Sequence, residues 1–199
     1  MSLMRRWIGT AGLAVILAGC ATTHFQTTWK NGAAQPVPMT GKKVLVVALN
    51  VPRFIRLGIE NAMAEELRDE GINGVPSFKV LDEQSTTAQA KAKALADGYD
   101  AAFVIRLADN EHDVIAGPSY APRDQDRTFL GSEGVWASAD LKSFTAYEKV
   151  WIETLVYSVR EDQLAWSGVT TTDNANIGAK CREIARMAIV ELKKQGLVL

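Results

Sequence analysis

The sequence predicts an α/β domain in which a mixed β-sheet is packed by helices. Short apolar runs rich in Val and Ala, typical of buried strands, alternate with segments whose apolar residues recur every three or four positions, typical of helices. The order is βαβαβ, followed by two strands around a short polar turn and by a C-terminal helix. Because strands that alternate with helices form right-handed crossovers, we expect three parallel strands and then an antiparallel hairpin.

The first strand of this pattern is Lys43–Leu49, a near-continuous apolar run that we expect to be buried on both faces. A helix is expected to begin near Pro52 and to end at Gly71, with its acidic residues, including Glu60, largely outside its buried face. That face is expected to carry apolar residues at four-residue spacing: Ile55, Ile59, Met63 and Leu67. The next elements are expected at Ser77–Leu81 (a strand after the breaker Gly74-Val75-Pro76), Thr86–Ala96 (a helix) and Ala101–Leu107 (a strand).

The second half begins with residues 116–143, where glycines and prolines predict a long loop, a feature that is often functional. The hairpin strands are expected at Tyr147–Val159 and Leu164–Thr172, around a polar turn at residues 160–163. Asp173 or Asn174 is expected to cap the last helix. The buried stripe of this helix is expected to consist of Ile177, Cys181, Ile184, Ala185, Ala188, Ile189 and Leu192.

The N-terminal segment has the three zones of an export signal. Arg5 and Arg6 precede an uncharged apolar stretch, which is too short to cross a hydrocarbon core roughly 30 Å thick. The stretch ends in Leu17-Ala18-Gly19-Cys20, which resembles the lipobox of bacterial lipoproteins. This resemblance implies that residues 1–19 are a signal peptide and that Cys20 is acylated. An ordinary cleaved signal, with Cys20 there by chance, is the alternative.

The lipobox resemblance also implies a location. The family's usual signal for inner-membrane retention is an Asp after the cysteine, and Ala21 stands there instead. The resemblance therefore implies an outer-membrane protein on the periplasmic side, held to membrane lipid through acylated Cys20. We expect residues 20–40 to be a lipidated N-terminus and tether, and 41–199 to be a single domain. Within the tether, Phe25–Lys30 is expected to dock as an edge strand, with Phe25 and Trp29 at the lipid interface as the alternative.

Charge and cysteine content narrow the class of protein. Without residues 1–19, which hold two of the 22 basic residues, 20 basic residues remain against 23 acidic ones, in an interspersed pattern. A nucleic-acid-binding protein would instead show a basic patch, so we expect no nucleic-acid partner. Cys181 has no intramolecular partner once Cys20 is acylated, and we expect a buried, inert thiol, with a redox role as the alternative.

No catalytic pattern stands out, and we expect neither an enzyme nor a cofactor. The sequence contains no dinucleotide-binding or phosphate-binding glycine motif and no HExxH. His24 lies in the expected tether, whereas His112 lies within the polar run 109–113, which could bind a cation but is expected to be a solvated or edge-protecting face, with no metal. Ser132, Ser138 and Ser143 lack a nucleophile-elbow pattern.

Two charged residues interrupt apolar strands. Arg106 and Glu153 are expected to form a cross-strand ion pair or to lie on a solvated sheet face, with an edge position or a ligand site as alternatives.

Aromatic residues gather in and beside the long loop: Tyr120, Phe129, Trp136, Phe144 and Tyr147. Such side chains must be buried against the sheet or presented to a partner, and they are our candidate partner surface.

At the level of the fold, the chain resembles the curli-secretion lipoproteins and the lipoprotein activators of penicillin-binding proteins. It also resembles small envelope lipoproteins at four segments: Gly41-Lys42-Lys43-Val44, Gly74-Val75-Pro76-Ser77, Glu153-Thr154-Leu155-Val156-Tyr157 and Trp166-Ser167-Gly168. Likeness of fold does not transfer function. Because no catalytic pattern stands out and the long loop carries aromatic residues, we expect a non-catalytic adaptor that binds an envelope protein. The alternative is a structural or stress-related lipoprotein that forms homo-oligomers at the membrane.

Overall fold

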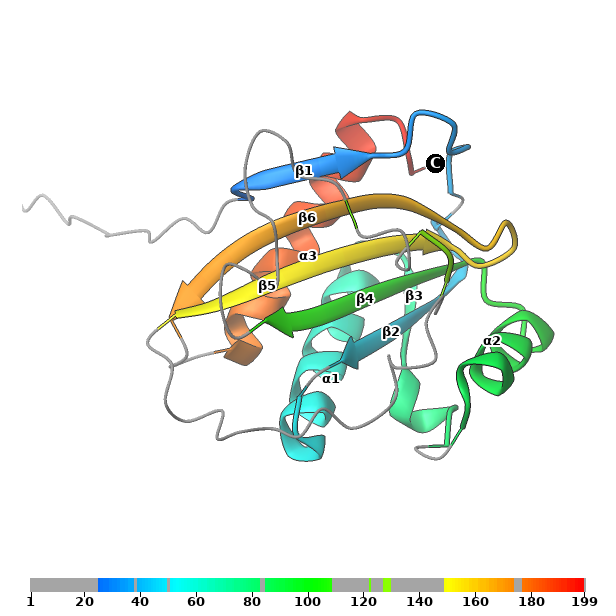
Figure 1. The fold of residues 1–199 in the computed structure, drawn as a ribbon, viewed down its shortest axis with the longest axis horizontal. Coiled ribbons are helices and arrows are strands. Elements are labelled where there is room, and N and C mark those ends of the chain that lie inside the picture. The colour runs from blue at the N-terminus through cyan, green and yellow to red at the C-terminus, as the bar shows by residue number, and fades with distance from the viewer. Residues whose placement is uncertain are drawn as a thin grey trace, which may run out of the picture.

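The computed structural model describes residues 25–37, 39–49, 51–82, 85–108, 122, 127–129, 149–173 and 177–198. Within these residues a mixed six-stranded sheet is packed by helices, which confirms the predicted fold class (Figure 1). The strand order across the sheet is β1-β6-β5-β4-β2-β3. The strands are β1 (Thr27–Lys30), β2 (Lys43–Leu49), β3 (Asn73–Pro76), β4 (Ala101–Ala108), β5 (Lys149–Ser158) and β6 (Gln163–Asp173).

Helices cover both faces of the sheet. The α-helices are α1 (Arg53–Asp69), α2 (Thr87–Ala96) and α3 (Ile177–Lys194). Helices α1 and α3 lie side by side on one face, as Figure 1 shows. Ala90 and Ala94 of α2 belong to a second core on the other face.

The alternation of side chains along β2 separates these two cores. Val44 and Val46 pack with α1 and α3, whereas Leu45 and Val47 pack with α2. Because successive side chains of a strand point to opposite faces, a strand covered on both sides must be apolar throughout. This confirms the prediction made for the Lys43–Leu49 run.

The prediction of a second strand at Ser77–Leu81 is wrong. The strand is β3, which contains the supposed breaker, and Ser77–Lys79 form a 3₁₀ helix. The backbone of Gly74 packs so closely on α1 that a Cβ there would lie 2.9 Å from the Ala64 Cα. Pro76 is tolerated because β3 is an edge strand, where a missing N–H costs little.

The described part of the expected tether, residues 25–37 and 39–40, packs on the domain. β1 pairs antiparallel with β6, which confirms the predicted edge strand. The Phe25 ring meets the Trp166 ring edge-on at 5.0 Å, Trp29 packs on the α2-side core, and Met39 is fully buried. The docked alternative therefore holds for both aromatic residues.

Local residues mark the ends of the helices. Gly71 has the positive φ that suits the predicted end of α1, Gly196 takes the same conformation after α3, and Thr86 caps α2 in a capping box with Gln89. Asp173, however, is the last residue of β6, and Asn174 lies outside the described residues. Asp162 closes the hairpin turn with a φ of 53°.

The topology sends several elements to one edge of the sheet. Strands β2, β3, β4 and β6 are parallel to one another, and β1 and β5 run the opposite way. We call the edge where β2, β4 and β6 end the carboxyl edge. The same edge holds the starts of β1, β5, α1 and α3.

Candidate functional site

Buried charges lie near the carboxyl edge, beside the last residues of β2. On the α2 side, Arg106 and Glu153 stand directly opposite each other on β4 and β5 and form an ion pair. Their side chains are 8% and 3% exposed. The predicted cross-strand pair is therefore confirmed, and the pair is shielded from solvent within the sheet.

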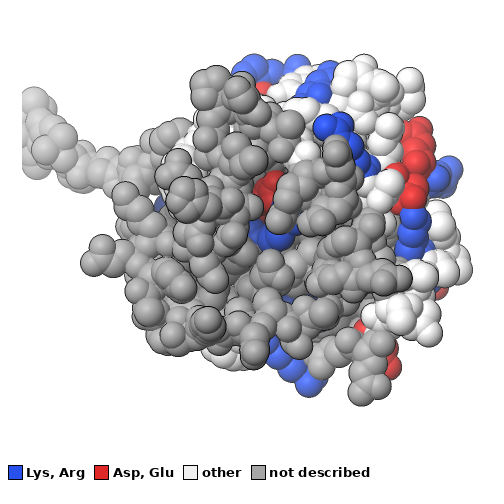
Figure 2. Space-filling view, in the orientation of Figure 1, with Lys and Arg blue, Asp and Glu red and all other residues white. Residues whose placement is uncertain are grey.

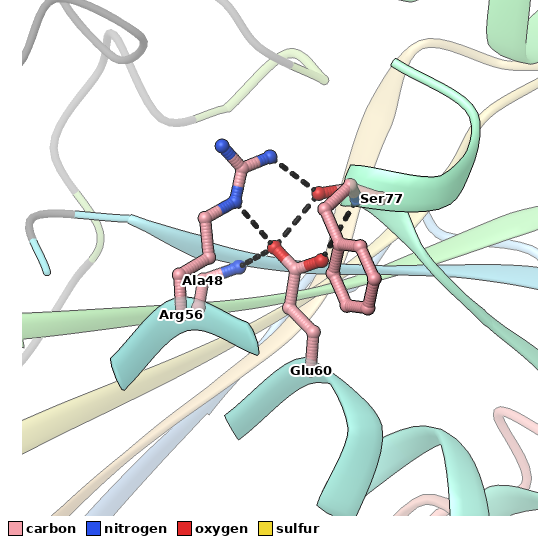
Figure 3. Close-up of polar contacts among 5 residues, drawn as sticks. Ala48, Arg56, Glu60 and Ser77 are labelled. Carbon is pink, nitrogen blue, oxygen red and sulfur yellow. Dashed lines mark hydrogen bonds and ion pairs between the residues drawn. The ribbon is translucent and has the colours of Figure 1, made fainter. Parts of the chain in front are cut away.

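Glu60 of α1 lies at the same level on the other face, and it is completely buried (Figure 3). Its Oε1 accepts hydrogen bonds from the Ala48 backbone N–H at 3.0 Å, from the Arg56 Nε at 2.8 Å and from the Ser77 Oγ at 2.7 Å. Its Oε2 accepts from the Phe78 backbone N–H at 3.1 Å. One carboxylate thus links α1, β2 and the 3₁₀ helix.

The end of β3 explains why a carboxylate is needed at this place. Pairing between β2 and β3 stops at Val46 and Pro76, so the Ala48 N–H points past the end of β3. A buried backbone donor without a partner is costly, and Glu60 supplies the missing acceptor. Arg56 balances the charge of Glu60 and also donates to the Ser77 Oγ at 2.7 Å.

The Glu60 cluster has the residue types of a proton-transfer site but the environment of a structural brace. The Ser77 hydroxyl donates to Glu60, yet Ser77 and Glu60 are both fully buried. With four donors around it, the carboxylate is saturated by the protein itself. A nucleophile must reach its substrate, so this arrangement suits packing rather than chemistry.

A second set of charges joins the two helices on the α1–α3 face. Arg186 forms two hydrogen bonds with Glu66, at 2.6 and 3.1 Å, and these bonds, followed by the attraction of the Glu66 charge, raise the pKa of Arg186. Ion pairs between Arg182 and Glu65 and between Lys193 and Glu70 flank this contact, at 2.6 and 3.1 Å.

The charged residues visible on the opposite face are mixed in sign. In Figure 2, blue and red side chains of the described residues lie next to one another along the right-hand margin of the molecule. This mixture agrees with the interspersed charge of the sequence.

A short described piece of the β4–β5 connection is fixed at the hairpin turn. Asp162 Oδ1 accepts a hydrogen bond from the Phe129 backbone N–H at 2.9 Å, and its other oxygen pairs with Lys91 of α2. The Arg127 carbonyl accepts from the Leu164 N–H at 2.8 Å. The Phe129 ring is fully buried and packs on Tyr157, with 5.6 Å between ring centroids.

Cys181 is fully buried on the stripe of α3, as predicted. Burial raises the pKa of its thiol to about 12. Because the thiolate is the reactive form, this environment makes the thiol inert at neutral pH.

The structure describes few of the predicted site residues. Cys20, both histidines, and Tyr120, Trp136, Phe144 and Tyr147 of the candidate partner surface lie outside the described residues. Phe129 is described, and its ring is buried, which is the first of the two outcomes expected for these aromatic residues. It is therefore not part of an exposed surface.

Two features are absent from the described residues. No helix there is both long and apolar enough to span a membrane. Nor do three or more His, Cys, Asp or Glu side chains gather there as metal ligands would.

Sequence reasoning missed the buried role of Glu60, which we had expected to lie outside the apolar face. A usable signal was present, because Arg56, Glu60, Met63 and Leu67 follow helical spacing and the first two are an i,i+4 pair. The burial of Glu66, 4% exposed, was missed in the same way. Asp162 gave no such signal, because its partners lie far away in sequence.

Comparisons with known proteins concern the fold. No protein-family model matches the chain, and neither does any curated protein. Two crystal structures of the PelC dodecamer from Paraburkholderia phytofirmans match with TM-scores of 0.43 and 0.44, both at 14% identity over 81% of this chain and 94% and 93% of theirs. TolB from Acinetobacter baumannii matches with a TM-score of 0.41 at 10% identity, over 85% of this chain but 31% of TolB. At such scores the likeness carries no argument about function.

Proposed function

We propose that this protein is a lipid-anchored, periplasm-facing lipoprotein of the outer membrane that acts by binding another envelope protein, without catalysis. The observation that carries the proposal is the lipobox-like Leu17-Ala18-Gly19-Cys20 after a short apolar run. The folded residues supply a stable α/β body in which the polar clusters found are braces between elements.

The proposed contact surface is the β4–β5 connection around residues 116–147. Ala108 and Trp151 face each other across β4 and β5, so this connection leaves and re-enters the domain at the carboxyl edge. Phe129 ties one part of it into the core. A connection anchored in this way can present its other aromatic residues with less loss of conformational entropy on binding.

The anchor is tested by metabolic labelling with palmitate. Wild type is expected to take up label and to fractionate with the outer membrane, and Cys20→Ala is expected to lose both properties. Cys181→Ala is the matched control, because its thiol is buried and should carry no lipid. Unlabelled wild type would refute lipid anchoring.

The binding role is tested by crosslinking in cells from a photoreactive residue at position 136. We expect a discrete adduct with a second envelope protein, which a photoreactive residue at Val190, exposed on α3, should not give. An adduct of this chain with itself at position 136 would instead favour the homo-oligomeric structural protein. The absence of any adduct from position 136 would count against the adaptor.

A further inference from the structure

The polypeptide enters the folded domain at the carboxyl edge. The Gln26 N–H donates to the Val169 carbonyl at 2.8 Å, and Thr27 stands opposite Val169. Val169 in turn faces Glu153, which faces Arg106 near the end of β4. Phe25, the first residue that the structure describes, therefore lies at the edge where β2 and β4 end.

The distance from Cys20 to this point is short. Five peptide steps separate Cys20 from Phe25, and an extended chain covers at most about 3.6 Å per step, or roughly 18 Å. Phe25 stands two residues beyond the Thr27–Val169 pair, so the opposite edge, at Gln163, lies eight residues of β6 away, or roughly 27 Å. A flexible tether of about 20 residues would have let the domain rotate freely relative to the membrane. The short reach from Cys20 to Phe25 instead keeps the carboxyl edge closer to the anchor than the opposite edge.

A second feature of the same edge suits a lipid surface. Phe54, in the first turn of α1, is 75% exposed, and its neighbour Arg53 is exposed as well. That turn contains no acidic residue, although a helix N-terminus carries a positive partial charge and favours acidic side chains. An aromatic ring beside a cation matches the boundary between acyl chains and anionic headgroups.

We infer that the carboxyl edge of the sheet faces the lipid surface, with Phe54 at the acyl–headgroup boundary, so that the β4–β5 connection, which leaves the same edge, meets its protein partner beside the membrane. The inference rests on the proposed acylation of Cys20. Strand β2, which leads into α1, lies four strands from β1, or roughly 19 Å along the edge. The anchor and Phe54 are thus separate contacts that together set the tilt of the domain, with the β5–β6 turn pointing away from the membrane.

The test uses the full acylated chain in vesicles of phosphatidylethanolamine and phosphatidylglycerol, with a fluorescent label on one introduced cysteine. Ala179→Cys, exposed in the first turn of α3, reports the carboxyl edge, and Glu161→Cys, exposed in the hairpin turn, reports the opposite edge. Cys20 is acylated and Cys181 is buried, so neither competes for label. We expect lipids with a nitroxide headgroup to quench the label at position 179 several-fold more than the label at 161.

A variant pair tests the role of Phe54. Adding Phe54→Ser to Ala179→Cys is expected to reduce quenching at 179, whereas Val190→Ser, at an exposed apolar residue within α3, should leave it unchanged. Flotation with the vesicles separates the two proposals. If the wild-type chain proves to carry no acyl group and does not float, the anchor and the docking are overturned together. If the acylated chain floats but the labels at positions 179 and 161 are quenched equally, the docking alone is overturned. The same holds if Phe54→Ser leaves the quenching at position 179 unchanged.

Discussion

Glu60, Glu153 and Asp162 are acidic side chains that each join segments distant in sequence. Glu60 reaches from α1 to the ends of β2 and β3, Glu153 reaches across to β4, and Asp162 reaches α2 and Phe129. At the residue scale, the value of each contact depends on burial. A buried carboxylate that loses its partners leaves uncompensated charge, whereas an exposed ion pair contributes little.

Glu60→Gln should therefore destabilise the domain by roughly 3 kcal/mol, because a neutral amide turns its NH₂ group toward donors that need an acceptor. Glu65→Gln is the matched control on the same helix. Its pair with Arg182 is about half exposed, so we expect a change within about 0.5 kcal/mol. Urea unfolding followed by circular dichroism measures both values. Equal effects of the two substitutions would disprove the bracing role of Glu60.

Glu153→Leu should cost roughly 3–5 kcal/mol, because it leaves the buried Arg106 guanidinium without this carboxylate. The double variant Arg106→Met, Glu153→Leu removes both charges and should recover most of that loss. The same unfolding experiment gives the coupling free energy between the two residues. A double variant less stable than Glu153→Leu would show that the loss of stability does not come from the uncompensated charge of Arg106.

The Cys181 thiol should make stability depend on pH in alkaline solution. Its pKa is about 12 in the folded protein and 9.0 as the ordinary value, so the unfolded chain loses the proton first. This contribution to the free energy of unfolding is constant below pH 9 and falls between pH 9 and 12, by up to about 1.4 kcal/mol per pH unit. Subtracting the pH profile of Cys181→Ala from that of the wild type isolates the contribution of the thiol to the free energy of unfolding. A flat difference above pH 9 would contradict the buried thiol.

At the scale of the element, success in prediction followed local periodicity. Strands β2 and β4 and helices α1 and α3 carry patterns that depend on their own residues, and each was found within a few positions. β3 was misplaced because the need for Gly74 arises from the close approach of Ala64 on α1, a contact that no local pattern shows. Arg106 and Glu153 were paired correctly because charges inside apolar strands need a partner on a neighbouring strand.

The β5–β6 turn provides a test of a contact between elements. Asp162→Ala should release the Phe129 N–H and strain a backbone with φ of 53°, with a loss of roughly 1–2 kcal/mol and faster amide exchange at Phe129. Asp162→Asn is the control, since asparagine tolerates this φ and keeps the oxygen acceptor. It loses only the partly exposed pair with Lys91, worth under about 1 kcal/mol. Equal exchange in both variants would mean that Asp162 does not hold residues 127–129.

At the scale of the whole molecule, the N-terminal boundary was the least predictable part. Residues 25–40 are polar and contain two prolines, which is typical of a tether, yet their larger apolar side chains, Phe25, Trp29, Val37 and Met39, find sites on the domain. Those sites are made by residues from the far end of the chain, since Phe25 packs on Trp166 and Val37 bridges to Val198. A local reading of composition cannot detect such contacts.

The boundary leads to a prediction for shortened chains. A chain that begins at Phe25 should unfold cooperatively, whereas one that begins at Gly41, the boundary expected from sequence, should be strongly destabilised and prone to aggregate. The shorter chain loses the buried side chains of Val37 and Met39, worth roughly 3–6 kcal/mol together, out of a typical total of about 5–15. It also loses β1, which uncovers the edge of β6 and the Trp166 ring. Thermal unfolding and size-exclusion chromatography compare the two chains. If both melt at the same temperature as monomers, residues 25–40 are a tether after all, and the short reach from Cys20 to the carboxyl edge no longer orients the domain.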